Sequence, residues 1–190
     1  MILHDSTVNS FVLVALSEMG DKTQLLAFSL ASRFKRPWSI MAGIFCATIL
    51  NHGLAAYFGE RVSHLLNPQA AEVLIGISFI FFGFWTLKPD TLDEKVHPSN
   101  ASAFLTTTVL FFLAEIGDKT QLATMALGAQ YQAVLSVTVG TTFGMLVSDG
   151  LAVIAGDKLS GKVQMKYVRW FTAGLFFVYG AALIFSAFHR

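Results

Sequence analysis

The stretch Glu-Met-Gly-Asp-Lys-Thr-Gln-Leu at residues 18–25 returns at residues 115–122 as Glu-Ile-Gly-Asp-Lys-Thr-Gln-Leu. Both copies lie inside apolar segments long enough to cross a bilayer, where burying charge is most expensive. Ionisable residues in such segments indicate a functional site. Matching sets in two halves of a chain indicate an ion site shared between repeats.

The composition is that of a membrane protein. Of the 190 residues, 54% are hydrophobic and 13% are charged, and the mean hydropathy is +0.61. A soluble domain carries about 25% charged residues. The net charge of +1 and the lack of a basic run argue against a nucleic-acid partner, and the single cysteine, Cys46, excludes an intrachain disulfide. We find no histidine-rich metal set, nucleophile with a base, or phosphate loop, so we expect no enzyme and no prosthetic group.

Apolar stretches of about 20 residues, the length that a helix needs to cross the hydrocarbon, occur six times. The sequence therefore predicts an all-α membrane protein with six transmembrane helices, of which the first and fourth are long enough to tilt or break. The N-terminus lacks the basic segment of a cleaved signal, so we expect the first stretch to be retained. The predicted spans are Val8–Ser32, Trp38–Glu60, Ala70–Leu87, Ser102–Gln130, Ala133–Gly156 and Tyr167–Phe188.

The basic residues predict the orientation, because short loops rich in lysine and arginine stay in the cytoplasm. They are concentrated in the first, third and fifth connections, whereas the second carries Arg61 and the fourth carries no charge. We therefore expect a bacterial inner-membrane protein with both termini in the periplasm. The basic residues of the odd-numbered connections are Arg33, Lys35, Arg36, Lys88, Lys95, Lys158, Lys162 and Lys166.

A single register relates the two halves of the chain. Glu18 and Glu115 are 97 positions apart, and the same offset matches residues along three spans without a gap. An odd number of spans per copy makes the second copy enter the membrane from the opposite side. We thus predict two inverted three-helix repeats, residues 1–88 and 102–190, joined by a cytoplasmic linker at 89–101. Matched pairs include Leu13/Leu110, Gly43/Gly140, Gly53/Gly150, Phe79/Phe176 and Gly83/Gly180.

The acids of each copy are spaced for one face of a helix. Residues three apart lie together, so Glu18 is expected beside Asp21, and Glu115 beside Asp118. If the first and fourth spans face each other, the four carboxylates converge. Two motif lysines would leave a net charge that one divalent cation neutralises. Protons could replace that cation, because repulsion and burial both disfavour charged carboxylates.

Neutral oxygens near the acids extend this set. Carboxylate, amide and hydroxyl oxygens are hard ligands that suit Mg²⁺, Ca²⁺ or Mn²⁺ better than copper or zinc. We predict no catalytic residue and a metal site made of Glu18, Asp21, Glu115, Asp118, Gln24 and Gln121, supported by the hydroxyls of Thr23 and Thr120.

Other polar residues in the spans admit two interpretations each. Lys22 follows Glu18 by four residues, so the two can form a static pair within one helix, which we favour. Alternatively, Lys22 and Lys119 hold the site together and move outward when metal binds. Asn51 and Asp149 either support the site and its protons or simply hydrogen-bond within the bundle, and the same holds for His52.

The duplicated Glu-x-Gly-Asp-Lys-Thr motif resembles the mark of the Gdt-type cation/proton exchangers, a family that includes bacterial manganese exporters. The resemblance covers nearly the whole chain, and both motifs are intact. It implies that Glu18, Asp21, Glu115 and Asp118 bind the ion. It also implies export of a divalent metal, usually Mn²⁺ in bacteria and also Ca²⁺ in eukaryotic members.

We therefore expect a secondary transporter that exports Mn²⁺ in exchange for protons, within a lipid bilayer and without an obligatory protein partner. The alternatives are a Ca²⁺/H⁺ antiporter, a divalent cation channel, a membrane enzyme, and a metal sensor or assembly protein. A channel needs a continuous polar stripe, whereas phenylalanine and leucine flank both motifs.

Overall fold

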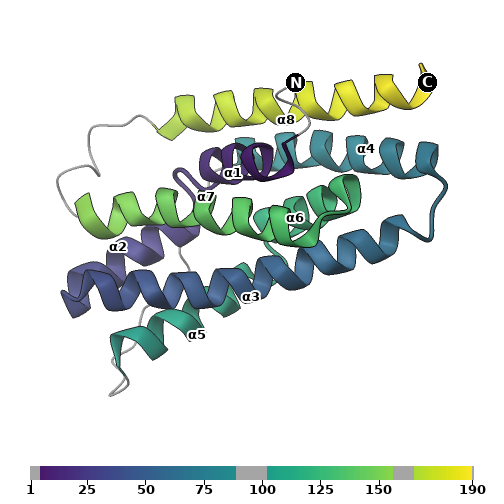
Figure 1. Cartoon of the computed structure of the whole chain (residues 1–190). Helices are drawn as coiled ribbons and strands as arrows, with labels where there is room; N and C mark the ends of the chain where they lie inside the picture. Colours follow the sequence, from purple (N-terminus) through teal and green to yellow (C-terminus); the bar gives the residue numbers. More distant parts are fainter. Residues whose placement is uncertain (1–4, 89–101, 156–164, 190) are drawn as a thin grey trace.

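The structure, a computed structural model, describes residues 5–88, 102–155 and 165–189. These residues form eight helices and no strand, which confirms the all-α prediction at that level (Figure 1). The expected linker at 89–101 lies outside the described residues. The helices are α1 Ser6–Ser17, α2 Lys22–Phe34, α3 Pro37–Ser63, α4 Pro68–Leu87, α5 Ala103–Glu115, α6 Lys119–Tyr131, α7 Val134–Ala155 and α8 Met165–Phe188.

Four of the described helices, α3, α4, α7 and α8, are long and apolar enough to cross a membrane. They coincide with the second, third, fifth and sixth predicted spans. α1 and α5 are also apolar but shorter, and each is followed by another short helix, α2 or α6. The first and fourth predicted spans are therefore each divided in two, and the division falls on the repeated motif.

Local sequence explains where the helices begin and end. Asn67 and Ser102 accept hydrogen bonds from backbone N–H groups of the first turns of α4 and α5, as N-cap residues do. Lys35 and Gln132 end α2 and α6 in the left-handed conformation, with φ of 51° and 49°. These two residues are 97 positions apart, so the repeat extends to the way in which the half-length helices end.

The two halves of the chain interlock. α3 packs on α5, α6 and α7, while α7 packs on α1, α2 and α3. The middle helix of each half thus contacts the divided helices of the other half. α4 and α8 lie side by side along the bundle (Figure 1).

Contacts across the bundle repeat with the offset of 97. The Thr48 hydroxyl lies 3.2 Å from Met145 Sδ, and the rings of Phe79 and Phe176 are 5.9 Å apart; both pairs join matched positions. Other contacts are also repeated. Gly43 lies close to Phe104 and Thr107 on α5, and Gly140 lies close to the corresponding residues on α1, Thr7 and Ser10. Matched residues therefore meet matched residues.

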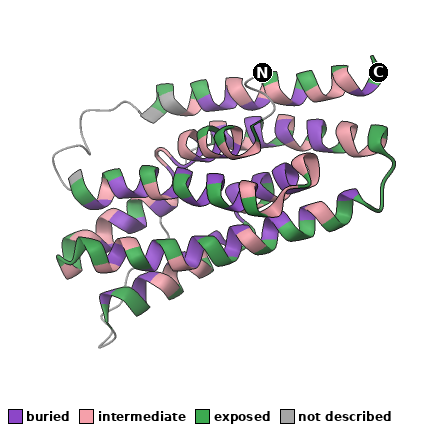
Figure 2. Cartoon of the chain, viewed as in Figure 1, coloured by how far each residue is buried: buried purple, intermediate pink, exposed green. Residues whose placement is uncertain are grey.

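Much of the outer surface is apolar. Large hydrophobic side chains such as Phe84, Leu135, Ile154 and Phe171 are exposed. Figure 2 shows such exposed positions alternating with buried ones along the helices. An extensive exposed apolar surface is typical of a protein that contacts lipid.

Candidate metal centre

Each motif forms a tight turn between two half-length helices. In the second copy, Ile116 has φ −62° and ψ 117°, Gly117 has φ +75°, and the Asp118 N–H donates to the Glu115 carbonyl at 3.1 Å. These are the features of a type II turn, which requires a positive φ at its third residue and therefore favours glycine there. The first copy has the same hydrogen bond, from Asp21 to Glu18, and Gly20 has φ +81°.

The turns correct one step of the sequence reasoning. We expected Glu18 to lie beside Asp21 because both share one helix face, but the helix stops between them. Asp21 and Asp118 instead occupy the N-cap positions of α2 and α6. Their carboxylates therefore sit at the positive ends of two helix dipoles, which favour negative charge.

Both motif glutamines stabilise these turns. The carboxamide oxygen of Gln24 accepts the Gly20 N–H at 2.9 Å, and that of Gln121 accepts the Gly117 N–H at 2.8 Å. Gln24 also donates to the Ser148 carbonyl on α7 at 3.0 Å. The glutamines thus satisfy backbone donors left free by the helix breaks. Their role as metal ligands stays a prediction.

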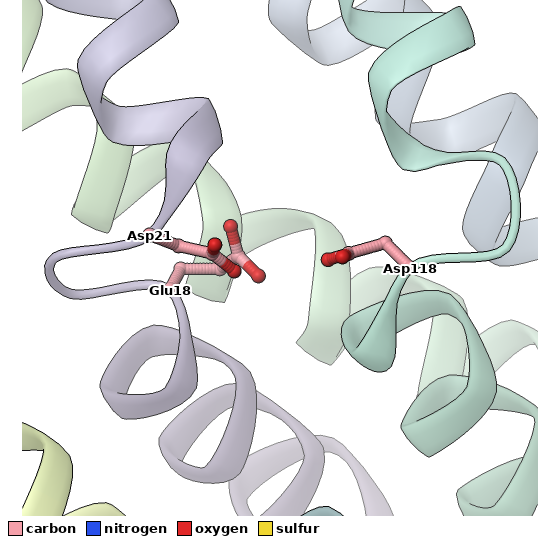
Figure 3. A group of neighbouring side chains, drawn as sticks. All are labelled: Glu18, Asp21 and Asp118. Atoms are coloured by element: carbon pink, nitrogen blue, oxygen red, sulfur yellow. The ribbon is translucent and has the colours of Figure 1, made fainter. Parts of the chain in front are cut away.

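Three carboxylates from the two halves meet at the centre of the bundle. One oxygen each of Glu18, Asp21 and Asp118 lie within 4.8 Å of one another, and all three residues are buried. Figure 3 shows Glu18 and Asp21 pointing from the turn after α1 toward Asp118, which follows α5. Acids from both copies of the motif therefore meet, as expected, in the case of these three residues.

Glu18 joins the two halves through both of its oxygens. One accepts the Thr23 hydroxyl of its own half at 2.5 Å, and the other accepts the Thr120 hydroxyl of the other half. Both threonines are fully buried. The two hydroxyls expected in support of the site thus fix the orientation of the Glu18 carboxylate.

The motif lysines form crossed ion pairs. Lys22 Nζ lies 3.1 Å from Asp118, and Lys119 Nζ lies 2.9 Å from Asp21. The favoured prediction that Lys22 pairs with Glu18 is therefore wrong, because its partner is Asp118. The helix break removes the i,i+4 geometry on which that pairing depended. Each lysine instead neutralises the aspartate of the opposite half.

Glu115 lies apart from the three-carboxylate group. Its carboxylate is fully buried, and His52 Nε2 is 3.8 Å away. It still interacts electrostatically with Glu18, Asp21 and Asp118. The sequence pattern placed Glu115 with the other acids but gave no sign of its contact with His52. Only the packing of α3 on α5 brings these two residues together.

The remaining predicted residues lie around the centre. Asn51 donates to the Phe112 carbonyl at 3.1 Å, which ties α3 to α5. Asp149 is fully buried, interacts electrostatically with Glu18 and Asp21, and accepts no hydrogen bond from the described residues. A buried carboxylate without a donor requires a proton, a cation or water nearby.

The oxygen atoms of the centre could hold a hard cation. Carboxylate oxygens at this spacing can bridge one Mg²⁺, Ca²⁺ or Mn²⁺ ion, and no sulfur or imidazole belongs to the three-carboxylate group. The ammonium groups of Lys22 and Lys119 already pair with Asp118 and Asp21, so a bound cation would have to compete with them. A helical membrane bundle with such a centre defines the class of ion-transporting membrane proteins.

Comparison with known proteins gives the family. The sequence matches the family described as "Divalent cation/proton antiporter GDT1" over residues 6–94 and 103–190. The chain belongs to this family of membrane transporters. The family resemblance seen in the sequence is thereby confirmed.

Individual relatives are similar over most of the chain. A Vibrio cholerae protein named "Putative manganese exporter" is 45% identical over 177 residues, covering 93% of this chain and 88% of its own. "GDT1-like protein 3" of Oryza sativa subsp. indica is 28% identical over 215 residues, covering 96% and 75%. "GDT1-like protein sll0615" of Synechocystis is 28% identical over 193 residues, covering 88% and 91%. No solved structure matches the chain.

Proposed function

We propose that the protein exports Mn²⁺ from the cytoplasm in exchange for protons. The observation that carries this proposal is the buried group of Glu18, Asp21 and Asp118, contributed by both halves. Family membership supports the exchange of a divalent cation for protons. Oxygen ligands suit both manganese and calcium. The choice of manganese therefore rests on the printed name of the Vibrio relative.

In this proposal α1 with α2, and α5 with α6, each cross the membrane as one broken span. Together with the four long helices they make six spans, arranged as inverted repeats of residues 1–88 and 102–190. The matched contacts of Thr48 with Met145 and of Phe79 with Phe176 support a pseudo-two-fold axis between the halves. Broken helices at the bilayer midplane are a known design of ion-binding transporters.

The orientation follows from the positive residues. The C-terminal ends of α2 and α4 lie at the same end of the bundle. This end carries Arg33, Lys35, Arg36 and Lys88. We place this end in the cytoplasm of a bacterial inner membrane, and both termini in the periplasm.

The crossed ion pairs suggest how loading and release proceed. A divalent cation entering the centre displaces the ammonium groups of Lys22 and Lys119 from the two aspartates. Glu18 and Glu115 complete the ligand set in this proposal, and Gln24 and Gln121 hold the turns. Protons that reach the same carboxylates favour release of the metal. Asp149 and Asn51 support this exchange from α7 and α3.

The test is metal-driven proton movement in inverted membrane vesicles. Respiration acidifies the vesicle interior, and addition of Mn²⁺ should release protons, seen as recovery of a quenched pH-sensitive dye. We expect Asp21→Asn and Asp118→Asn to abolish this recovery and Mn²⁺ uptake, because each removes a charged ligand. Competition with Ca²⁺ and Mg²⁺ measures the metal preference.

Glu60→Gln is the matched control, because Glu60 is an acid on α3 outside the centre, and it should transport normally. Size-exclusion profiles check that the variants are folded. Full Mn²⁺ transport by both aspartate variants would overturn the site. Mn²⁺ flux that neither moves protons nor responds to a pH gradient would overturn the exchange.

A further inference from the structure

A second polar cluster lies away from the motif, at the end of the bundle where α1 begins and α8 ends. Asn9 Nδ2 on α1 donates to the Tyr131 hydroxyl on α6 at 2.8 Å, and the Tyr131 and Tyr179 hydroxyls are 2.5 Å apart. Tyr179 lies on α8. We call Asn9, Tyr131 and Tyr179 the tyrosine latch. It connects α1, α6 and α8.

The latch lies between a cavity and the core. A cavity of about 400 Å³ at the same end is lined by residues of α4, α6 and α8. Gln130 and Tyr131 form part of its wall, together with Glu72 and Ser186. On the core side, the Phe79 ring lies 4.9 Å from the ring of Tyr179 and belongs to a buried apolar cluster with Leu13 and Phe176. Access from the cavity toward the centre is therefore blocked by the latch and the rings behind it.

The residues at the matching positions cannot form such a latch. At the offset of 97, Tyr131 corresponds to Phe34 and Tyr179 corresponds to Phe82, neither of which has a hydroxyl. The packing of the helices around these matching positions differs as well. α1 packs on α8 and α4 on α6, whereas the matching pairs, α5 with α4 and α8 with α2, make at most marginal contact among the described residues.

Exposure of the motif lysines follows this asymmetry. Lys22 is 27% exposed, while its counterpart Lys119 is 4% exposed. Since the two halves have matched sequences, equal packing would expose both lysines equally. The helices are thus packed more closely at the end where α1 begins and α8 ends than at the other end.

We propose that the tyrosine latch is the outer gate of the transporter, which must open for the cation to leave the centre toward the periplasm. This inference rests on the proposed function, since it assigns the more closely packed end to the release side. The hydroxyl hydrogen bonds hold α1, α6 and α8 together while the centre is reached from the cytoplasm. Loss of one hydroxyl shifts the equilibrium toward the outward-open state.

The test measures accessibility and does not depend on transport. In a Cys46→Ser background, Leu13→Cys places one thiol behind the latch, one helical turn inward from Asn9 on α1. A membrane-impermeant thiol reagent is applied from the periplasmic side. Tyr179→Phe should raise the labelling rate about five-fold, the factor that corresponds to one typical hydrogen bond. Tyr131→Phe should raise it further, because this hydroxyl takes part in two hydrogen bonds.

Two controls make the result decisive. Tyr57→Phe removes a hydroxyl from the exposed face of α3 and should leave labelling unchanged. Leu110→Cys, the counterpart of Leu13 on α5, should label readily from the cytoplasmic side of inverted vesicles and more slowly in the latch variants. Unchanged labelling at Leu13→Cys, or faster labelling at both reporters, overturns the gate. A protein that gates as expected but moves no Mn²⁺ overturns the proposed function alone.

Discussion

At the scale of single residues, the centre depends on crossed charge neutralisation. Each aspartate occupies the N-cap position of one half-helix and pairs with the lysine that begins the half-helix of the other repeat. Lys119 is almost completely buried and Lys22 is partly exposed, so the two pairs differ in strength. A buried pair that loses one partner leaves an uncompensated charge, which is more costly than the loss of an exposed pair.

Double-mutant cycles on the free energy of unfolding test this pairing. For Lys119→Gln with Asp21→Asn we expect a coupling of about 1–3 kcal/mol, in the range of contacting residues. For Lys22→Gln with Asp118→Asn the coupling should be below about 1 kcal/mol, because Lys22 is partly solvated. The measurement is thermal or denaturant unfolding of the protein in detergent.

Lys22→Gln with Glu18→Gln is the internal control of this experiment. The structure has no ion pair between these residues, so their coupling should be near zero. A coupling for this i,i+4 pair larger than that of Lys22 with Asp118 would contradict the crossed arrangement.

At the scale of the helix, the two glycines decide where the first and fourth spans break. Gly117 has a positive φ, and a Cβ there would meet no atom within 4 Å. Its requirement for glycine is therefore conformational and not steric. The glutamine three residues after each aspartate then satisfies an N–H group of the turn, in the manner of a helix-capping side chain.

The substitution Gly117→Ala measures the conformational cost of a positive φ at this position. We expect the substitution to lower the free energy of unfolding by about 1–2 kcal/mol, the cost of a left-handed conformation for an L-residue. Gly174→Ala is the matched control, because Gly174 also has open space around its Cβ position but lies within α8. It should raise the stability by up to about 1 kcal/mol. Equal effects of the two substitutions on unfolding in detergent would exclude the turn as the reason for glycine.

At the scale of the whole molecule, the halves are interlocked and do not simply lie side by side. α3 supports the broken helix of the second half, and α7 supports that of the first. Close backbone approaches reinforce this packing: a Cβ at Gly128 on α6 would lie 2.3 Å from the Ala56 carbonyl oxygen on α3. Small residues permit such contacts between membrane helices.

This arrangement predicts the behaviour of a divided chain. Residues 1–88 and 102–190 made as separate polypeptides should each be unstable, because each half buries its centre only against the other. Made together, they should associate, copurify through a tag on one half, and restore Mn²⁺ transport in inverted vesicles. A single half that is stable and monodisperse alone would contradict the interlocked packing.

The helical membrane class, the family and the principal acids could all be predicted from the amino-acid sequence. Hydrophobic segment length and the repeated motif are local signals, and they do not depend on how helices pack. The meeting of Glu18 and Asp21 with Asp118 was also predictable, since a duplicated chain places equivalent residues near a common axis. The glycine at the third position of each turn was the available signal for the helix breaks.

Which charges meet depends on how the helices pack. The pairing of Lys22 with Asp118, the contact of His52 with Glu115 and the tyrosine latch all join residues at least 48 positions apart in sequence. No local pattern encodes such contacts, because they depend on which helix faces of the two halves are pressed together. The same packing makes two nearly equivalent halves unequal, since α1 packs on α8 and α4 on α6 while the matching helix pairs make at most marginal contact among the described residues.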